Sequence, residues 1–436
     1  MRVYKPSGIE WLGEIPKHWE IRRLKYLFYI SKEESRDEFP NVLSLTQNGI
    51  IERDITTNKG QLAQNYIGYN IVKRGDIILN PMDLSSGYAA KSTFEGVISQ
   101  AYIKIRPLKT LNLSYYESFF QNLYHYKILW HLGKGISYDH RWTLGNDVFL
   151  NIKIPLPPLQ EQKEIAEFLD KKCEKIQNYI DKKQKLITLL QEKKQALINQ
   201  AVCGRVACHT ERSEVSTTAY KPSGIEYLGL IPHHWEVRRV ATLGKFFKGS
   251  NISKNDLQDS GVCVVLYGDI YTKYEIKTKQ FQSKIAENFA KDKTQILCGD
   301  LLFSGSGETK EDIGKCICYL GNEKAYVGGD VIVLRQMGQD SLFLSYVLNS
   351  DYIKYQKAVI SKGEIIIHIY ASNLRDLKIP LPPLHEQKEI AAFLDSKVAQ
   401  INSAIEKTKK QIELIKEYKN TLINEAICGR INLERK

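Results

Sequence analysis

The sequence predicts an α+β protein with two globular domains separated by a long antiparallel two-helix coiled coil, the whole arranged as a pseudo-twofold tandem repeat. Three separate segments occur twice in the 436-residue chain and keep the same order in both halves. Such repetition indicates one structural unit present in two copies. In each copy a stretch without Gly or Pro follows a proline-rich string, which predicts a helix much longer than a small domain needs.

The first repeated segment, the opening repeat, begins each half of the chain. It reads YKPSGIEWLGEIPKHWEIRRL at Tyr4–Leu24 and YKPSGIEYLGLIPHHWEVRRV at Tyr220–Val240, and 16 of its 21 positions are identical. Its His-Trp pairs, His18-Trp19 and His234-Trp235, cannot account for any difference between the halves. We expect them in the core of a common frame, with a docking surface for a partner protein as the alternative.

Between the repeats the two halves differ almost completely. Residues 24–152 and 240–377 are rich in Val, Ile, Tyr and Phe in short runs that Gly, Asn, Asp and Ser interrupt. This pattern is typical of short strands and turns, and a helix is expected over Ser114–Leu132. Each half therefore contains a globular α+β domain of shared architecture and unlike surface.

The second repeated segment marks the start of each predicted helix. It reads KIPLPPLQEQKEIAEFLD at Lys153–Asp170 and KIPLPPLHEQKEIAAFLD at Lys378–Asp395. Its paired prolines suit the beginning of a helix, and no further Gly or Pro occurs before Gly204. The third segment, NQAVCGR at 199–205 and NEAICGR at 424–430, supplies the glycine that ends each helix.

Apolar residues in both helices recur at alternating spacings of four and three, the pattern of a coiled-coil seam. Polar residues interrupt it at equivalent places, Lys183 and Lys194 in the first helix and Thr408 and Lys419 in the second. A helix of roughly 43 residues spans about 65 Å, whereas a compact domain of this size is about 35 Å across. Only antiparallel helices let the second domain connect the end of one to the start of the other. The predicted seam residues are Leu169, Ile176, Ile180, Ile187, Leu190, Leu197, Leu394, Ile401, Ile405, Ile412, Ile415 and Leu422.

These features divide the chain into five parts. They are a first globular domain with its opening repeat (1–155), a first spacer helix (156–206), a linker (207–219), a second globular domain with its opening repeat (220–380) and a second spacer helix (381–436). The linker, ACHTERSEVSTTA, is polar and rich in small residues, as flexible linkers are.

Composition favours an anionic partner. The net charge is +12, from 62 Lys and Arg against 50 Asp and Glu, and nucleic acid is the first candidate for such a basic chain. The sequence has no apolar run of membrane-spanning length and no signal-peptide pattern, so we expect a cytoplasmic protein. Its eight cysteines are spread thinly, without the density of a disulfide scaffold or the spacing of a zinc site.

Three local patterns resemble parts of catalytic sites, and none is complete. Residues 80–83, Asn-Pro-Met-Asp, differ from the Asn-Pro-Pro-aromatic motif of amino methyltransferases at their third and fourth positions. Before Gly314-Lys315, the GxxxxGK spacing of a phosphate loop fails because Thr309 stands where glycine is required. Glu275 with Asp269 offers half of a metal nuclease site without a second carboxylate-bearing strand. The chain is therefore expected to be non-catalytic and to bind no metal.

Base readout uses Arg, Lys, Asn, Gln, Ser and Thr side chains, so polar and basic loops of the two unlike globular domains, the variable domains, are the candidate DNA contacts. GKGISYDHRW at Gly133–Trp142 and SKGEIIIHIY at Ser361–Tyr370 share a Lys-Gly, a His five residues after the Gly and an aromatic residue two further on. A structural hydrogen-bonding role for these His residues is an equal alternative. The candidate residues are Lys91, Lys134, Ser137, Tyr138, His140, Arg141, Lys248, Asn251, Ser306, Lys310, Lys362, His368 and Tyr370.

The repeated strings resemble those of the specificity (S) subunit of type I restriction-modification enzymes. The resemblance rests on Ile15–Glu20 and Pro155–Gln162 and on their copies at Ile231–Glu236 and Pro380–Gln387. It covers essentially the whole chain and includes the order of its parts, in which a variable domain and a repeat helix alternate.

The resemblance implies that each globular domain is a target-recognition domain that reads one half of a bipartite double-stranded DNA sequence, with the helices setting the gap. Because the two domains differ, the half-sites should differ in sequence. It also implies two adenine methyltransferase (M) subunits with S-adenosylmethionine, and restriction (R) subunits with ATP and Mg, while this chain itself holds no cofactor. One alternative is a coiled-coil protein-interaction scaffold without DNA specificity, and another is a self-contained methyltransferase or nuclease.

Overall fold

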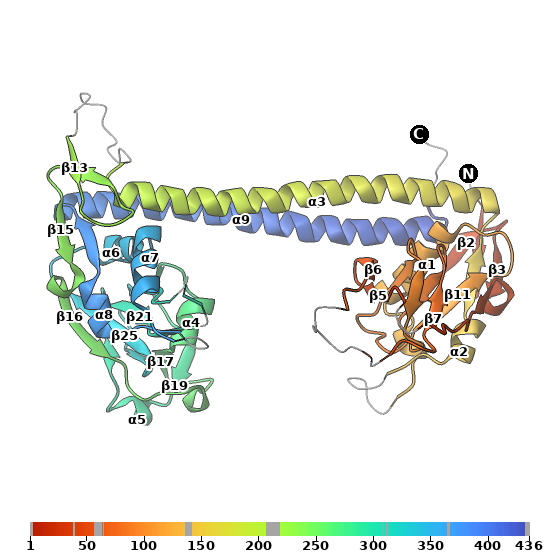
Figure 1. The fold of residues 1–436 in the computed structure, drawn as a ribbon, viewed down its shortest axis with the longest axis horizontal. Coiled ribbons are helices and arrows are strands. Elements are labelled where there is room, and N and C mark those ends of the chain that lie inside the picture. Colours follow the sequence, from red (N-terminus) through yellow and green to blue (C-terminus); the bar gives the residue numbers. More distant parts are fainter. Residues whose placement is uncertain are drawn as a thin grey trace. The chain divides into compact units, whose positions relative to one another are not determined.

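The structure is a computed structural model that describes residues 3–37, 40–55, 63, 65–135, 142–205, 219–307, 309–310, 313–363 and 367–431 (Figure 1). It divides into two compact units, Met1–Gln184 with Lys409–Lys436 and Lys185–Thr408. The division passes through both long helices, α3 (Leu159–Val202) and α9 (Leu384–Ile427). Each unit therefore holds one globular domain and a part of each long helix.

The globular domain of the first unit is built on a four-stranded antiparallel sheet in the order β4-β11-β8-β9. Smaller two-stranded pairings surround it, β1 with β2, β3 with β12, β5 with β6 and β7 with β10. The strands are β1 (Tyr4–Pro6), β2 (Glu14–Pro16), β3 (Glu20–Arg23), β4 (Phe28–Ile30), β5 (Leu43–Thr46), β6 (Gly49–Glu52), β7 (Asn70–Val72), β8 (Ile77–Leu79), β9 (Ala89–Lys91), β10 (Gly96–Ile98), β11 (Ile103–Pro107) and β12 (Lys153–Leu156). The helices besides α3 are α1 (Leu113–His125) and α2 (Asn146–Asn151), with short 3₁₀ turns at Leu24–Tyr26 and Trp130–Leu132.

Helix α1 covers this sheet with an aromatic face. Asn112 caps it by accepting a hydrogen bond from the Tyr115 amide, and the buried face includes Phe119 and Phe120. A continuous helix over Ser114–Leu132 was expected, and that expectation is wrong at its C-terminal end. The helix ends at His125 because Lys127 adopts a φ of 54°, a left-handed conformation that an α-helix does not accommodate.

The globular domain of the second unit has two larger sheets. A five-stranded sheet runs β16-β25-β21-β23-β18 and a four-stranded sheet runs β19-β17-β24-β20, with β13-β14, β15-β27 and β22-β26 as separate pairs. The strands are β13 (Tyr220–Pro222), β14 (Leu230–Pro232), β15 (Glu236–Arg239), β16 (Gly244–Lys248), β17 (Val262–Val265), β18 (Lys277–Thr278), β19 (Ser283–Ile285), β20 (Gln295–Ile296), β21 (Leu301–Ser304), β22 (Ser306–Gly307), β23 (Cys316–Tyr319), β24 (Ala325–Val327), β25 (Val331–Gln336), β26 (Ile367–His368) and β27 (Lys378–Leu381). The helices are α4 (Tyr267–Thr272), α5 (Glu287–Ala290), α6 (Ser341–Leu348), α7 (Asp351–Ile360) and α8 (Ala371–Asp376), with 3₁₀ turns at Val240–Thr242 and Lys254–Asp256.

Contacts inside each unit fix the relative direction of the two long helices. In the first unit Leu169, near the start of α3, shares a core with Ile427 at the end of α9. In the second unit Val202, at the end of α3, shares a core with Leu394 near the start of α9. The start of each helix therefore lies with the end of the other, as antiparallel packing requires.

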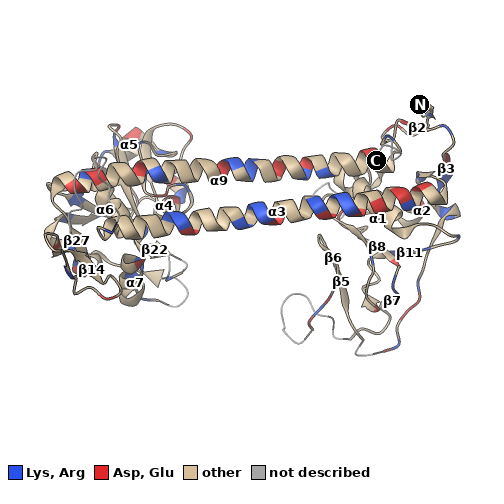
Figure 2. Ribbon diagram, turned by 90° about the horizontal axis from the view of Figure 1, so that it is seen from above, with Lys and Arg blue, Asp and Glu red and all other residues tan. Residues whose placement is uncertain are grey.

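All twelve predicted seam residues are buried or half-buried, whereas Leu189 and Leu414 on the same helices are 51% and 55% exposed. Outside the seam, Lys and Arg are interspersed with Asp and Glu along both helices (Figure 2). No helix in the described part of the chain is long and apolar enough to span a membrane. The predicted spacer boundaries at 156 and 381 lie three residues before the observed helix starts. All but the last residue of the predicted linker, 207–219, lies outside the described residues.

Candidate nucleic-acid interface

The two His-Trp pairs hold the first turns of the long helices in the same way in both units. Trp19 is fully buried, and its indole Nε1 donates a hydrogen bond to Glu161 Oε2 at 3.1 Å, while His18 Nε2 lies 2.5 Å from Glu161 Oε1. In the second unit Trp235 Nε1 donates to Glu386 Oε2 at 2.9 Å, and His234 Nε2 lies 2.7 Å from Oε1. Both tryptophans lie in the core, as expected for a frame residue, whereas both histidines are about half-exposed.

The end of the other long helix contacts the same opening repeat. In the first unit the Arg430 guanidinium donates to the Leu12 carbonyl at 2.8 Å, and in the second Arg205 donates to the Leu228 carbonyl at 2.7 Å. Each opening repeat is thus held by the start of one long helix and the end of the other, and this arrangement occurs twice.

A repeated glutamine attaches each variable domain to this frame. Gln162 Oε1 accepts a hydrogen bond from the amide of Asn112, the cap of α1, at 2.9 Å. Gln387 Oε1 accepts one from the amide of Asp340, the cap of α6, at 3.0 Å. Helices α1 and α6 are therefore equivalent, although their sequences differ, so the frame presents the two domains through the same contact.

In the second domain the structure brings four of the predicted DNA-binding residues into one cluster. His368 on β26 faces Ser306 on β22, and the serine Oγ lies 3.0 Å from His368 Nδ1. Lys362 and His368 exchange two backbone hydrogen bonds, and the Tyr370 ring stacks on the His368 ring at 6.4 Å. Ser306 is buried and holds the imidazole, whereas Tyr370 is 54% exposed. The cluster thus offers an aromatic face beside a lysine, groups that contact bases and phosphates.

Two further predicted residues belong to the same end of the five-stranded sheet. Lys248 pairs with Ile332 at the start of β25, and Ser304 at the end of β21 pairs with Val331. Lys248 and Asn251, which follows it in a turn, therefore lie at the sheet end from which β22 continues, and both are exposed. Lys310 is exposed in a turn between β22 and β23, and no hydrogen bond or ion pair within the described part of the chain links it to this cluster.

In the first domain, the predicted DNA-binding residues that the structure describes do not form a cluster like that of the second domain. The Lys91 ammonium donates to Ser114 Oγ at 2.6 Å and its amide to Glu117 Oε1 at 2.9 Å, so this lysine is engaged with α1. Lys134 is exposed and pairs through its backbone with Thr143. The remaining predicted residues, Ser137, Tyr138, His140 and Arg141, lie outside the described residues.

The incomplete catalytic patterns have structural partners. Glu275 is bonded to Lys194 at 3.1 Å and to Asn402 at 3.1 Å, and Asp269 accepts a hydrogen bond from Ser283. Cys316 lies on a buried strand, where burial raises the pKa of its thiol to about 12. In the described ranges, no group of three or more His, Cys, Asp or Glu side chains is placed to hold a metal ion.

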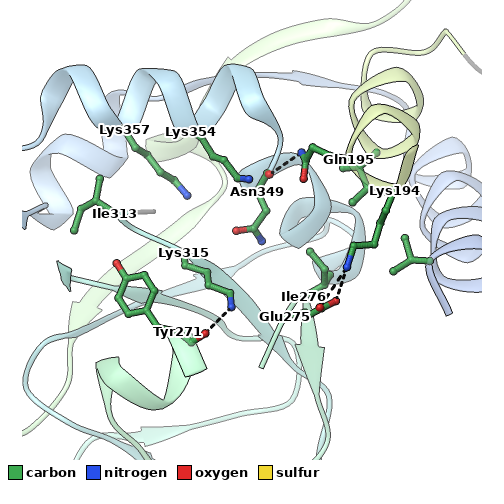
Figure 3. Close-up of a pocket in the computed structure, with 12 residues that line it drawn as sticks. Lys194, Gln195, Tyr271, Glu275, Ile276, Ile313, Lys315, Asn349, Lys354 and Lys357 are labelled. Atoms are coloured by element: carbon green, nitrogen blue, oxygen red, sulfur yellow. Dashed lines mark hydrogen bonds and ion pairs between the residues drawn. The ribbon is translucent and has the colours of Figure 1, made fainter. Parts of the chain in front are cut away.

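Sequence reasoning missed a set of lysines that line a cavity of the second unit, Lys194, Lys315, Lys354 and Lys357 (Figure 3). Lys194 gave a signal because it interrupts the apolar seam, and Lys315 belongs to the incomplete Gly314-Lys315 pattern. Lys354 and Lys357 lie one turn apart on α7, but Lys194 on α3 and Lys315 before β23 are distant in sequence, so no sequence spacing joins the whole set.

Comparison with known proteins identifies the family. The profile described as the type I restriction modification DNA specificity domain matches residues 16–189 and 232–414, one stretch in each half of the chain. The chain belongs to the type I restriction-modification DNA specificity family. Each matched stretch runs from the opening repeat into a long helix, so the family unit coincides with the tandem repeat.

Individual relatives of this specificity family match over nearly the full length. The MjaVIII specificity subunit of Methanocaldococcus jannaschii is 26% identical over all of this chain and 98% of its own length. The putative MjaX specificity subunit of the same organism is 24% identical over 97% of this chain and 96% of its own length. These likenesses do not favour a coiled-coil scaffold without DNA specificity.

Solved structures show the same fold. A chain from a structure of a type I restriction-modification system matches with a TM-score of 0.68 and 16% identity, over 96% of this chain and 99% of that chain. The HsdS subunit of Thermoanaerobacter tengcongensis matches with a TM-score of 0.51 and 16% identity, over 96% and 98%.

Proposed function

We propose that this specificity subunit reads an asymmetric bipartite DNA target, with one half of the target read by each globular domain. The observation that carries the proposal is a single frame, present twice, that holds two unlike domains through equivalent contacts of Gln162 and Gln387. Identical frames fix how each domain is presented, and different surfaces fix what each one reads. The half-sites therefore differ in sequence.

The long helices act as the spacer between the half-sites. Support comes from the apolar seam and from the pairing of the start of each helix with the end of the other within each unit. These contacts support the proposed antiparallel two-helix coiled coil, whose length sets the gap in the target.

The same frame serves as the scaffold for the catalytic subunits. Two methyltransferase subunits bind it, one for each copy, because the frame presents the same surface twice. S-adenosylmethionine binds those methyltransferase subunits, and ATP and Mg bind the restriction subunits that complete the complex. The specificity subunit itself contributes no catalytic group, and the complex acts on DNA in the cytoplasm.

Base and phosphate contacts come from the predicted DNA-binding residues of the two domains. In the second domain the His368–Tyr370 stack with Lys362, together with Lys248 and Asn251 at the same sheet end, forms the contact surface. The basic excess of the chain supplies the salt-dependent part of the affinity.

Long-read methylation mapping of host DNA, with this gene present and deleted, tests the proposal. The expected result is a gapped, asymmetric motif with methyladenine in both halves that disappears on deletion. If no motif changes, DNA binding by the purified chain is measured as salt is raised. A steep loss of affinity with salt then indicates a silent methyltransferase partner, whereas no binding at low salt contradicts the proposal.

A further inference from the structure

The main sheets of the two globular domains share one register, which makes their residues comparable position by position. In the first domain Arg106 on β11 forms a two-pronged ion pair with Asp76, with Nε–Oδ1 and Nη2–Oδ2 distances of 2.7 and 3.0 Å. In the second domain Arg335 on β25 forms the same pair with Asp300, at 2.9 and 2.7 Å. Strand β11 therefore corresponds to β25. The two aspartates directly precede β8 and β21, so these strands also correspond.

This register identifies the first-domain counterpart of Lys248, which belongs to the proposed contact surface of the second domain. The two arginines pair across the sheet with Tyr29 on β4 and Lys245 on β16. Three residues after these partners come Lys32 and Lys248, and both lysines are exposed. Lys32 therefore stands where Lys248 stands.

The chain beyond these strands makes the same backbone contacts in both domains. Thr143 exchanges two backbone hydrogen bonds with Lys134, as His368 does with Lys362. The residue after Thr143 donates a backbone hydrogen bond at 2.9 Å to Pro81 in the segment that follows β8, and the residue after His368 makes the same contact at 3.0 Å to the segment that follows β21. Thr143 and Pro81 thus border the sheet end that corresponds to the one at His368.

A hollow of about 240 Å³ lies at this end of the first sheet. Lys32 and Pro81 belong to its wall, and three amide side chains, Asn70, Gln100 and Asn146, also line it. These amides come from β7, from the segment before β11 and from the start of α2. The counterpart of the second domain's contact surface therefore gathers side chains of the types that read bases.

The amide of Asn70 indicates that this hollow binds a polar ligand. Asn70 is only 6% exposed, yet its side chain makes no hydrogen bond to any residue that the structure describes. A buried amide without partners costs free energy, and a ligand or water that bonds it removes that cost. The exposed side chains of Lys32 and Asn146 are likewise without a hydrogen bond or ion pair to the described residues.

Charge in the hollow is balanced, which favours base edges over phosphate as its ligand. Lys32 and Glu34 are the charged side chains among its described lining residues. Gln100 donates from its amide nitrogen to Glu34 Oε1 at 3.4 Å and to the Gly68 carbonyl, and its own carbonyl oxygen remains available as an acceptor. Directional donors and acceptors, and not an excess of positive charge, therefore characterise this surface.

We infer that the first domain reads its half-site with the side chains around this hollow, Lys32, Gln100 and Asn146, with Asn70 behind them. Asn and Gln side chains bond N6 and N7 of adenine in the major groove, and Lys bonds guanine or a phosphate. Asn70 is set back in the wall, so water carries its contact, as ordered water does in other protein–DNA interfaces. The inference rests on the proposed reading of DNA and assigns that reading, in the first domain, to residues that the sequence patterns did not single out.

Selection of binding sites from a pool of random DNA duplexes by the purified full chain, at low salt, tests the inference. We expect the parent chain to select a gapped motif. Asn146→Ala and Gln100→Ala should each reduce the preference for one base pair about tenfold, in the same half of the motif, and leave the other half unchanged. Both side chains are exposed, so the variants should fold, and general damage to the domain would not relax a single position.

Lys32→Ala should weaken binding of the selected duplex and make its salt dependence less steep, because one contact to the duplex is lost. Lys109→Ala is the matched control, since Lys109 is exposed and follows the opposite end of β11, and it should bind as the parent chain does. Unchanged base preferences in both amide variants overturn the inference while the proposed function stands, and so does equal binding by the Lys32→Ala and Lys109→Ala chains. A parent chain that selects no motif overturns the proposed function and this inference with it.

Discussion

Single carboxylates determine how the opening repeats are held. Glu161 and Glu386 each accept a hydrogen bond from a buried indole and contact a histidine, and each lies in the first turn of a long helix. The positive end of the helix dipole stabilises a carboxylate at this position. One side chain thus joins the helix start to the opening repeat, which explains why the His-Trp and Glu residues recur together.

Replacing either carboxylate should leave a buried tryptophan N–H without an acceptor. We expect Glu161→Ala to lower the free energy of unfolding by about 1–3 kcal/mol, and Glu386→Ala to do the same for the second unit. Urea unfolding measures the loss, and faster hydrogen exchange of the Trp19 or Trp235 indole N–H locates it. Glu167→Ala, at an exposed position of the same helix, is the control and should stay within about 0.5 kcal/mol of the parent chain. Unchanged indole exchange in Glu161→Ala would contradict the assigned role.

Lys357 should make stability depend on pH in the alkaline range. Burial lowers its pKa to about 8 in the folded chain from 10.5 ordinarily, so between these values the unfolded chain binds more protons. Stability therefore rises with pH in this window, by up to about 1.4 kcal/mol per pH unit, and the gain is lost as pH falls through 8. Urea unfolding of Lys357→Met and parent chains at several pH values between 7.5 and 10 should show a smaller rise in the variant. Parallel curves for the two chains would be the contrary result, since other titrating groups are common to both.

At the scale of elements, two glycines let the long helices end against the opening repeats. Gly204 and Gly429 have φ of +70° and +73°, and a Cβ at either position would lie 2.5 Å and 2.7 Å from the rings of Pro232 and Pro16. Each glycine is therefore required both for its left-handed conformation and for the close approach of a proline.

Alanine substitutions separate these two requirements. Gly224→Ala and Gly8→Ala introduce the same left-handed strain, since φ is +69° at both, but nothing lies within 4 Å of the new Cβ. Each of these two substitutions should lower the free energy of unfolding by about 1 kcal/mol. Gly204→Ala and Gly429→Ala add a clash with a proline ring, and we expect this clash to lower the free energy of unfolding by a further amount of about 1–3 kcal/mol. Urea unfolding checks the difference within each unit, and equal costs for Gly204→Ala and Gly224→Ala would show that the contact is not tight.

Elements with local or repeated signals could be predicted from the sequence. The prolines before Leu159 and Leu384 and the glycines after the helices bracket α3 and α9, and the repeats identify the common frame. The end of α1 could not be predicted, because nothing in the sequence indicates the positive φ at Lys127. The Ser306–His368 pairing joins strands about 60 residues apart in sequence, so only the fold reveals it. The cavity lysines were missed for the same reason.

At the scale of the molecule, the frame contacts are interchangeable between the two halves. The first domain is held by the start of α3 and the end of α9, and the second by the start of α9 and the end of α3. Exchanging the two helices exchanges the two sets of contacts, which the proposed pseudo-twofold repeat requires. In DNA-binding dimers with this symmetry, identical reading heads recognise an inverted repeat. The asymmetry of the proposed target then comes only from the unlike domains.

Duplicating one domain should therefore make the target symmetric. In a chain whose residues 240–377 are replaced by residues 24–152, both frame copies present the first domain. Long-read methylation mapping in a host with the partner subunits should then show a gapped inverted repeat of one parental half-site. The reciprocal chain, with the second domain in both places, is the matched control and should yield the inverted repeat of the other half-site. A direct repeat would exclude the twofold arrangement, because it requires both domains to face the same way along the DNA. An unchanged asymmetric motif would instead show that the exchanged residues do not read the bases.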